Sequence, residues 1–154
     1  MQNYEVVMAD TKPEMRNICR VGWGRSLSPL FLGDTSESWG WGGTGKKSHN
    51  GKYETYGTPF SVGDVVGCIL DIDDLSISFT KNGRFCGVAF TNLPADIRET
   101  GCFPHLLLKN VHVRVNFSTE SQWYPPPGKQ VIFMQDLQDH ELIPNPVHLD
   151  RFNN

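Results

Sequence analysis

The 154-residue chain has no apolar run long enough to cross a bilayer, and its first residues lack the basic and apolar regions of a secretory signal. Its 38% hydrophobic and 20% charged residues are ordinary for a folded domain and exclude a disordered chain. The length suits one domain with its own core. We expect an intracellular protein, nuclear or cytoplasmic, without a membrane partner.

The sequence also has few of the patterns that carry chemistry. Its four cysteines are too far apart for a zinc knuckle or a C-x-x-C redox pair, and Cys102 with His105 has no second ligand pair at zinc spacing. The aspartates within residues 71–74 lack the terminal Glu of a calcium loop. No G-x-S-x-G elbow is present, no cysteine stands in a nucleophile context, and the five histidines have no evident partners. We therefore predict reduced thiols, no cofactor and no catalytic activity.

Charge is weak overall and uneven along the chain. The net charge of −3 gives no general attraction to nucleic acid. Residues 16–56 contain six Lys or Arg against three acidic residues, whereas residues 135–154 contain four acidic residues against one Arg. The sequence thus combines a basic segment with an acidic tail, and from residue 139 that tail has the composition of a linker.

What the chain does contain is a series of short strand patterns separated by turn residues. Strands are expected at residues 3–9, 17–23, 52–56, 64–72, 75–80, 85–90, 102–108, 111–117 and 131–134, with a helical turn within 91–101. The first two should be antiparallel neighbours, 64–72 a buried central strand, and 102–108 an edge strand or strand start because it contains Pro104. The series predicts an all-β fold, an antiparallel two-sheet β-sandwich, without an internal repeat or a second domain.

The clearest local signal is Asn82-Gly83, which favours a two-residue type I′ hairpin turn. That turn pairs Lys81 with Arg84 and then aligns the apolar residues of the two strands. The expected pairs are Phe79 with Cys86, Ile77 with Val88, and Leu75 with Phe90. A slip of one residue would destroy this match, so the turn and the pattern agree. We expect all six apolar side chains to point into the core.

Residues 39–50, WGWGGTGKKSHN, fit a nucleotide-binding loop only in part. Gly40, Gly45 and Lys46 match the G-x-x-x-x-G-K spacing, but Lys47 holds the position of the hydroxyl that ligates Mg²⁺ and Ser48 comes one residue late. The stretch also lacks the preceding apolar strand and the following helix that phosphate binding uses. We predict that nucleotide is not bound and that the glycines serve close packing or a sharp turn.

Taken in order, these segments resemble a SPRY domain. The matching pieces are YEVVMA (4–9), CRVGW (19–23), WGWGGTGKKSHN (39–50), YETYG (53–57), DVVGCILDID (64–73), ISFTKNGRFCGVAF (77–90), CFPHLLLKN (102–110) and VRVNF (113–117). The most specific piece, GGTGKKSHN, is similar to the SPRY domains of heterogeneous nuclear ribonucleoprotein U and its relatives and of a DEAD-box RNA helicase. The run YPPPGKQVIFMQDL is more similar to the ribonucleoprotein.

The resemblance implies a bent two-sheet sandwich at residues 1–127, followed by a C-terminal strand and polar tail at 128–154. It implies a non-catalytic module of an RNA-associated protein that binds a protein or peptide through loops on one face. Gly24 stands where the family usually has Ser, and Ser118 where it usually has Gly. Larger members carry strands upstream of this start, so either such strands lie outside this chain or its tail strand replaces them.

The expected binding face combines the loop at 24–36 with the stretch 39–50, where positive charge meets the apolar patch Leu30-Phe31-Leu32. The candidate partner-binding residues are Arg20, Leu30, Phe31, Trp39, Trp41, Lys46, Lys47, His49 and Tyr53. Such a face suits an acidic peptide with one or two apolar anchors. Basic residues interleaved with aromatics also suit single-stranded RNA, so direct RNA binding is the alternative. The net charge and the lack of an RNP motif favour the peptide.

Overall fold

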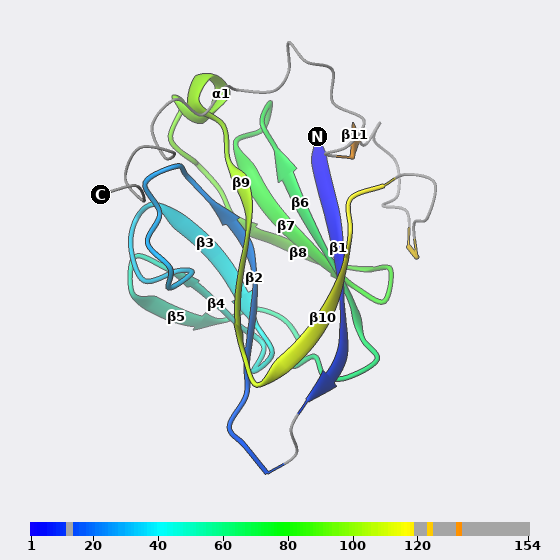
Figure 1. Cartoon of the computed structure of the whole chain (residues 1–154). Helices are drawn as coiled ribbons and strands as arrows, with labels where there is room; N and C mark the ends of the chain where they lie inside the picture. Colours follow the sequence, from blue (N-terminus) through cyan, green and yellow to red (C-terminus); the bar gives the residue numbers. More distant parts are fainter. Residues whose placement is uncertain (12–13, 119–122, 125–131, 134–154) are drawn as a thin grey trace, which may run out of the picture.

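The computed structural model describes residues 1–11, 14–118, 123–124 and 132–133 as two sheets packed face to face (Figure 1). Sheet A contains β1 (Gln2–Thr11), β6 (Val65–Asp71), β7 (Ser76–Lys81), β8 (Arg84–Phe90), β10 (Val111–Asn116) and β11 (Ile132–Phe133). Sheet B contains β2 (Ile18–Gly24), β3 (Ser38–Gly42), β4 (Lys46–His49), β5 (Lys52–Thr55) and β9 (Phe103–Lys109). The expected all-β antiparallel sandwich is confirmed.

The strand order is β10-β1-β6-β7-β8 in sheet A and β5-β4-β3-β2-β9 in sheet B. All of these neighbours are antiparallel, whereas β11 pairs in parallel with the start of β1. Among the described residues the single helix is α1 (Ile97–Thr100), within the segment expected to hold a helical turn. No described helix has the length and apolar character needed to cross a membrane.

The core lies between the sheets because alternate residues of the facing strands are apolar. Tyr4 and Phe79 come from sheet A, Trp23 and Trp41 come from sheet B, and all four are fully buried. The Tyr4 and Trp23 rings meet edge to face with 5.1 Å between their centroids, and the Trp41 and Phe79 rings are tilted at 5.6 Å. Every residue of β6 is buried, which confirms it as the central strand of its sheet.

One buried hydroxyl joins the two sheets. The Tyr4 hydroxyl of β1 donates to the carbonyl of Gly22 in β2 and accepts from the Gly22 amide at 3.0 Å. A Cβ atom at Gly22 would lie 2.0 Å from the Trp39 carbonyl oxygen, so β2 and β3 can approach this closely only at a glycine. Burial raises the pKa of Tyr4 well above its usual value, which keeps the hydroxyl protonated for both bonds.

The expected pairing of the first two strands is wrong. β1 lies between β6 and β10 in sheet A, while β2 lies between β3 and β9 in sheet B. The chain crosses from one sheet to the other after β1, after β5, after β8 and after β9. Both strands bury one face in the same core, so their apolar patterns fit either arrangement.

The hairpin of β7 and β8 is confirmed at its turn, where Lys81 pairs with Arg84 and Asn82 and Gly83 both have positive φ. Farther from the turn, two irregularities shift the register, so that Ser78 pairs with Val88 and Ile77 with Phe90. Gly87, with φ of +93°, supplies the left-handed conformation typical of such bulges.

The bulges also change which side chains of this hairpin face the core. Ile77 and Phe79 are fully buried, and Leu75, Cys86 and Phe90 pack at the margin of the core. Val88 was expected inside and is 50% exposed. Ser78 and Thr80 are buried on the opposite face of β7, so the orientation of that strand holds.

A buried carboxylate anchors the chain after β10 to the outer face of sheet A. Glu5 accepts hydrogen bonds from the Asn116 side chain at 3.2 Å and from the amides of Trp123 and Tyr124 at 3.0 and 2.8 Å. Three donors offset the cost of burying this group. Of the strand expected at 131–134, Ile132 and Phe133 pair with Gln2 and Asn3, while Val131 and Met134 lie outside the described residues.

Ile77→Ala should lower the free energy of unfolding by about 2–5 kcal/mol, because it removes buried methylenes and leaves a cavity between the sheets. Urea denaturation of both proteins measures the difference. Val88→Ala is the control. Because the Val88 side chain is half-exposed, this substitution removes little buried apolar surface and should change the free energy of unfolding by less than about 1 kcal/mol. Equal losses in the two variants would contradict the described packing.

Candidate functional site

The segment between β2 and β3, here called the β2–β3 loop (residues 25–37), folds back onto the outer face of sheet B. Leu32 is fully buried there, contrary to the expectation of a continuous exposed apolar patch. The sheet makes room with glycine, since a Cβ at Gly40 would lie 2.8 Å from Leu32 Cγ. Gly33, with φ of +88°, likewise brings the loop backbone onto Ser48.

Hydrogen bonds hold the loop backbone along its length. The Gly33 amide donates to Ser38 Oγ at 2.8 Å, and the Arg20 guanidinium donates to the Leu32 carbonyl at 3.0 Å. The turn between β4 and β5 adds two bonds, from Asn50 N to Thr35 O and from Gly51 N to Gly33 O, both at 3.0 Å. The loop is therefore ordered by its own sheet rather than left to solvent.

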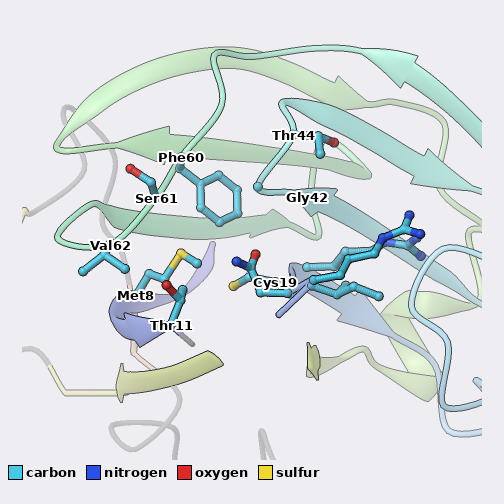
Figure 2. A pocket seen from close by; sticks show the side chains of 13 residues that line it. Met8, Thr11, Cys19, Gly42, Thr44, Phe60, Ser61 and Val62 are labelled. Carbon is cyan, nitrogen blue, oxygen red and sulfur yellow. The ribbon is translucent and has the colours of Figure 1, made fainter. Parts of the chain in front are cut away.

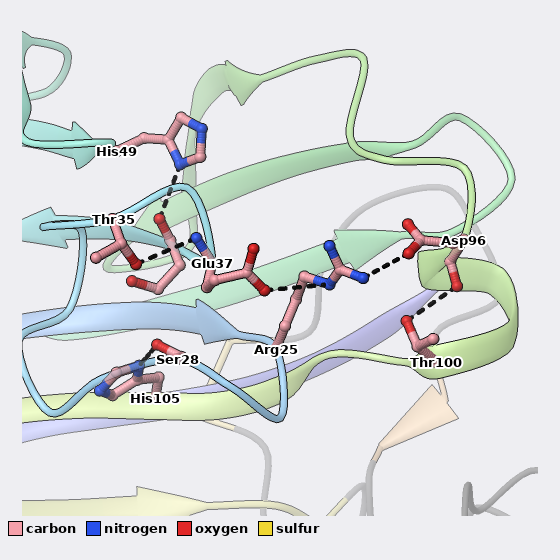
Figure 3. A network of polar contacts seen from close by, with 9 residues as sticks. Arg25, Ser28, Thr35, Glu37, His49, Asp96, Thr100 and His105 are labelled. Carbon is pink, nitrogen blue, oxygen red and sulfur yellow. Dashed lines mark hydrogen bonds and ion pairs between the residues drawn. The ribbon is translucent and has the colours of Figure 1, made fainter.

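An ionic network closes the base of the loop (Figure 3). The Arg25 amide donates to the Glu37 carbonyl at 2.8 Å, and its guanidinium lies 3.7 Å from the Glu37 carboxylate. The same guanidinium pairs with Asp96, just before α1, and the Asp96 carbonyl accepts from Thr100 Oγ1 at 2.9 Å. These contacts tie both ends of the loop to one helix.

The tethered loop displays apolar side chains outward. Leu27, Leu30 and Phe31 are 67%, 84% and 59% exposed. Beside them, Tyr53 donates to Asp34 at 2.8 Å, and the Arg20 guanidinium carbon lies 5.0 Å above the Tyr53 ring. The Asp34 amide also donates to the Phe31 carbonyl at 3.2 Å, so Asp34 bonds both the Phe31 backbone and the Tyr53 hydroxyl.

The remaining predicted site residues divide between two faces. Lys46 is exposed and diagonal to Tyr53 on the outer face of sheet B. Lys47 points the other way, donating to the Ala89 carbonyl at 2.8 Å and lying 3.6 Å from Glu54. His49 bonds the Ser38 carbonyl and stacks on Trp39, while Trp39 and Trp41 belong to the core. Only Arg20, Leu30, Phe31, Lys46 and Tyr53 therefore share the outer surface.

The sequence was searched for a metal pair at His105, but it did not predict that His105 contacts the β2–β3 loop from β9. Its Nδ1 lies 3.3 Å from Ser28 Oγ, and its Nε2 lies 3.2 Å from the Leu30 carbonyl (Figure 3 shows the Ser28 contact). A Cβ at Gly24 would lie 2.8 Å from His105 Nδ1. The glycine that replaces the usual serine of the family was the available signal, because it gives the imidazole room to reach the loop.

Metal and thiol chemistry have little support in the described part of the chain. No group of three or more His, Cys, Asp or Glu there is placed to hold a metal ion. All four cysteines are free, and burial raises the pKa of Cys19 to about 11, which leaves this thiol protonated and a poor nucleophile. Burial also raises the pKa of Cys102, to about 12.

Comparison with known proteins identifies the family, because residues 3–120 match the SPRY domain. The chain belongs to the SPRY domain family. It is 40% identical over 123 residues to the ATP-dependent RNA helicase DDX1 of Xenopus laevis, covering 80% of this chain and 16% of that protein. It is 42% identical over 130 residues to Ddx1 of Drosophila melanogaster, covering 84% and 18%.

A second group of relatives is represented by heterogeneous nuclear ribonucleoprotein U-like protein 2 of Mus musculus. That protein is 33% identical over 129 residues, which cover 82% of this chain and 17% of the relative. The expected resemblance to both groups is thus confirmed. The chain spans only 16–18% of the length of these three relatives.

In this SPRY domain the stretch 39–50 forms a hairpin of β3 and β4, with Gly43, Thr44 and Gly45 in its turn. A phosphate-binding loop instead runs from a strand into a helix. Lys46 and Lys47 stand on β4 and point to opposite faces, so they do not converge on one phosphate group.

We therefore expect no binding of Mg-ATP in isothermal titration at about 1 mM ligand, a concentration that would reveal free energies of about −4 kcal/mol. Saturable heat that Lys46→Ala abolishes would contradict this. Lys52→Ala is the matched control, because Lys52 is an exposed lysine outside the glycine-rich stretch.

Stability should fall as pH decreases from about 7.5 to 5.5, because His105 is neutral in the folded loop contact. Its burial lowers the pKa of the imidazole, an effect that the hydrogen bond to the Leu30 carbonyl opposes. The unfolded chain therefore binds a proton first as pH falls through about 6.5, and the stabilisation is complete only above that value.

His105→Gln removes the titrating group and keeps a donor for the Leu30 carbonyl. The difference in melting temperature between this variant and the unsubstituted chain should change with pH over the same range. A constant difference would show that His105 does not couple the loop to pH.

Proposed function

We propose that this SPRY domain is a non-catalytic protein-interaction module that binds a peptide or protein partner through the outer surface of the β2–β3 loop. One observation carries the proposal: Leu27, Leu30 and Phe31 are exposed on a loop whose backbone is fixed to sheet B. Exposed apolar side chains grouped on an ordered loop are typical of interaction sites.

The order of this loop supports binding as well as display. A partner that docks on a mobile loop must offset the entropy lost when that loop becomes fixed. Here the buried Leu32, the Gly33–Ser38 bond and the Arg25 network fix the loop within the domain itself. Burial of Leu30 and Phe31 against a partner can then contribute most of its apolar free energy to affinity.

The charge around these anchors favours an acidic partner. Arg20 is half-buried and paired with Asp34 at 3.5 Å, while Lys46 is exposed beyond it. A cation at the rim of an interface mainly raises the association rate and its dependence on salt. We infer that apolar anchors set affinity and that Lys46 contributes mainly to association.

Direct RNA binding by the 39–56 region receives less support from these positions. Trp39 and Trp41 are buried in the core, so Tyr53 is the aromatic ring left beside Arg20 for stacking with a base. Lys47 is engaged with the Ala89 carbonyl and Glu54. An RNA-associated, nuclear or cytoplasmic setting is proposed from the relatives, which are named as an RNA helicase and a ribonucleoprotein-like protein.

The proposal predicts that Leu30→Ser with Phe31→Ser reduces capture of protein partners by the full chain at least about tenfold, since buried apolar anchors carry most interface affinity. Captured proteins are quantified by mass spectrometry after RNase treatment. The melting temperature should stay within about 2 °C, because both side chains are exposed in the free domain.

The matched control is Phe85→Ser with Val88→Ser, two similarly exposed residues on β8. It should retain the partners that the loop variant loses. Partners lost only from the β8 control would place the binding face on sheet A. Partners lost from the unsubstituted chain on RNase treatment, together with RNA affinity that falls steeply with salt, would favour the RNA alternative.

A further inference from the structure

A cavity of about 510 Å³ opens at the end of the sandwich where β1 finishes and β2 begins (Figure 2). Its other walls are the turn between β3 and β4 and the segment 60–62. This volume is within the range of small-molecule sites, about 300–1,000 Å³. The cavity takes no part in the β2–β3 loop surface described above, except that Arg20 contributes to both.

Backbone hydrogen bonds join the walls of the cavity. The Gly43 amide donates to the Cys19 carbonyl at 2.9 Å, and the Phe60 amide donates to the Gly43 carbonyl at 3.1 Å. The Gly63 amide in turn donates to the Met8 carbonyl at 2.8 Å. Four segments distant in sequence are thus fixed to one another, and the cavity exists before any ligand arrives.

The floor and the rim of the cavity differ in chemistry. Buried Met8, Cys19 and Phe60 form an apolar floor, and Figure 2 shows their side chains gathered between the four segments. Exposed Thr44 and Ser61 lie on the rim and offer hydroxyl groups. An apolar floor under a polar rim selects a ligand that buries a hydrocarbon group and keeps a polar group at the opening.

The charges of the lining residues further restrict the class of ligand that suits the cavity. The 13 lining residues include Arg16 and Arg20 and no aspartate or glutamate. Arg20 already donates a hydrogen bond to the Leu32 carbonyl and forms an ion pair with Asp34. Arg16 is exposed and makes no ion pair within the described residues, while its carbonyl is held by the Asn110 side chain at 2.9 Å. The rim therefore presents one cation that is available to a ligand carboxylate.

We propose that this cavity receives a branched apolar side chain of a partner peptide, with an adjacent acidic residue of that peptide paired to Arg16. The proposal extends the proposed function, because Arg20 makes the cavity continuous with the loop surface and one extended peptide can occupy both. A nucleobase suits the cavity poorly, since the apolar floor offers few partners for its polar edges.

The probe is N-acetyl-leucyl-aspartyl amide, added to the ¹⁵N-labelled full chain and followed by NMR. Saturable shifts are expected at the amides of Gly43, Thr44 and Ser61, with a dissociation constant of about 1 mM, which is typical of so small a ligand. The leucyl-lysyl and glycyl-aspartyl counterparts should each bind about fivefold more weakly or worse, because each lacks one of the two contacts.

Equal binding of the aspartyl and lysyl peptides would overturn the acidic preference, and absence of shifts at these amides would overturn the site. Uridine monophosphate is added in a parallel titration to test whether the cavity binds a nucleotide. If it binds these amides more tightly than the leucyl-aspartyl probe, the cavity recognises a nucleotide phosphate and the peptide proposal fails.

Two variants test the site within the protein. Ser61→Trp fills the cavity from an exposed position whose backbone bonds with Asp64 can persist, and it should reduce probe affinity at least about tenfold. Ala95→Trp, an exposed position outside the cavity, is the control and should bind normally. Arg16→Glu should weaken the aspartyl probe and strengthen the lysyl one. Unchanged probe binding in Ser61→Trp contradicts the proposal.

One further variant distinguishes the proposal for the cavity from the proposal for the loop surface. The chain carrying Leu30→Ser and Phe31→Ser should bind the dipeptide as the unsubstituted chain does, even if it loses its protein partners. If instead the dipeptide binds and partner capture is insensitive to the loop variant, the cavity stands and the loop surface does not.

Discussion

The buried hydroxyl of Tyr4 is the contact on which the rest of the arrangement depends. It comes from sheet A and satisfies both backbone groups of Gly22 in sheet B, although β1 and β2 are not neighbours in either sheet. Leaving a buried amide without this partner would cost about 1–3 kcal/mol. The bond also fixes the position of β2 relative to the core. In β2, Arg20 precedes Gly22 and the β2–β3 loop follows it. The packing of the core therefore determines where the site lies.

Glycine residues in sheet B allow the close packing that fixes the surface loop against the sheet. Gly22 lets β3 approach β2, and Gly40 leaves a space on the outer face of sheet B that Leu32 fills. The loop that enters this space buries Leu32, while Leu30 and Phe31 beside it are exposed. Packing at Leu32 holds the loop segment that exposes Leu30 and Phe31 against sheet B. The same density of glycine in the β3–β4 turn brings that turn against Phe60 and shapes the cavity at the end of the sandwich.

Much of the fold could be predicted because its strongest signals are local. Asn82-Gly83 and the apolar run of β6 each carry enough information in a few residues to define a turn and a central strand. The sheet that each strand joins is a long-range property, and the patterns of β1 and β2 do not encode it. Val88 was misplaced because a bulge at Gly87 changes register without changing the apolar pattern.

The candidate site was less predictable for a related reason. Leu32 cannot be told from Leu30 and Phe31 by sequence, since its burial depends on Gly40 in another strand. Lys46 and Lys47 separate only when their strand is known, because adjacent residues of a strand face opposite sides. His105 acquires its role from contacts with Ser28 and Leu30, more than seventy residues away in sequence. Aromatic residues close in sequence to Lys and Arg suggested a partner-binding surface, but Trp39 and Trp41 lie in the core.

The β2–β3 loop is ordered by contacts within the domain before any partner binds. Amide hydrogen exchange of the free full chain tests this order directly, because exchange reports local opening. The amides of Arg25 and Gly33, bonded to the Glu37 carbonyl and Ser38 Oγ, should exchange at least about a hundredfold more slowly than in an unstructured peptide, in keeping with stable hydrogen bonding. Exchange of these two amides at peptide rates, while the amides of β6 remain protected, would show that the domain does not hold this loop in order.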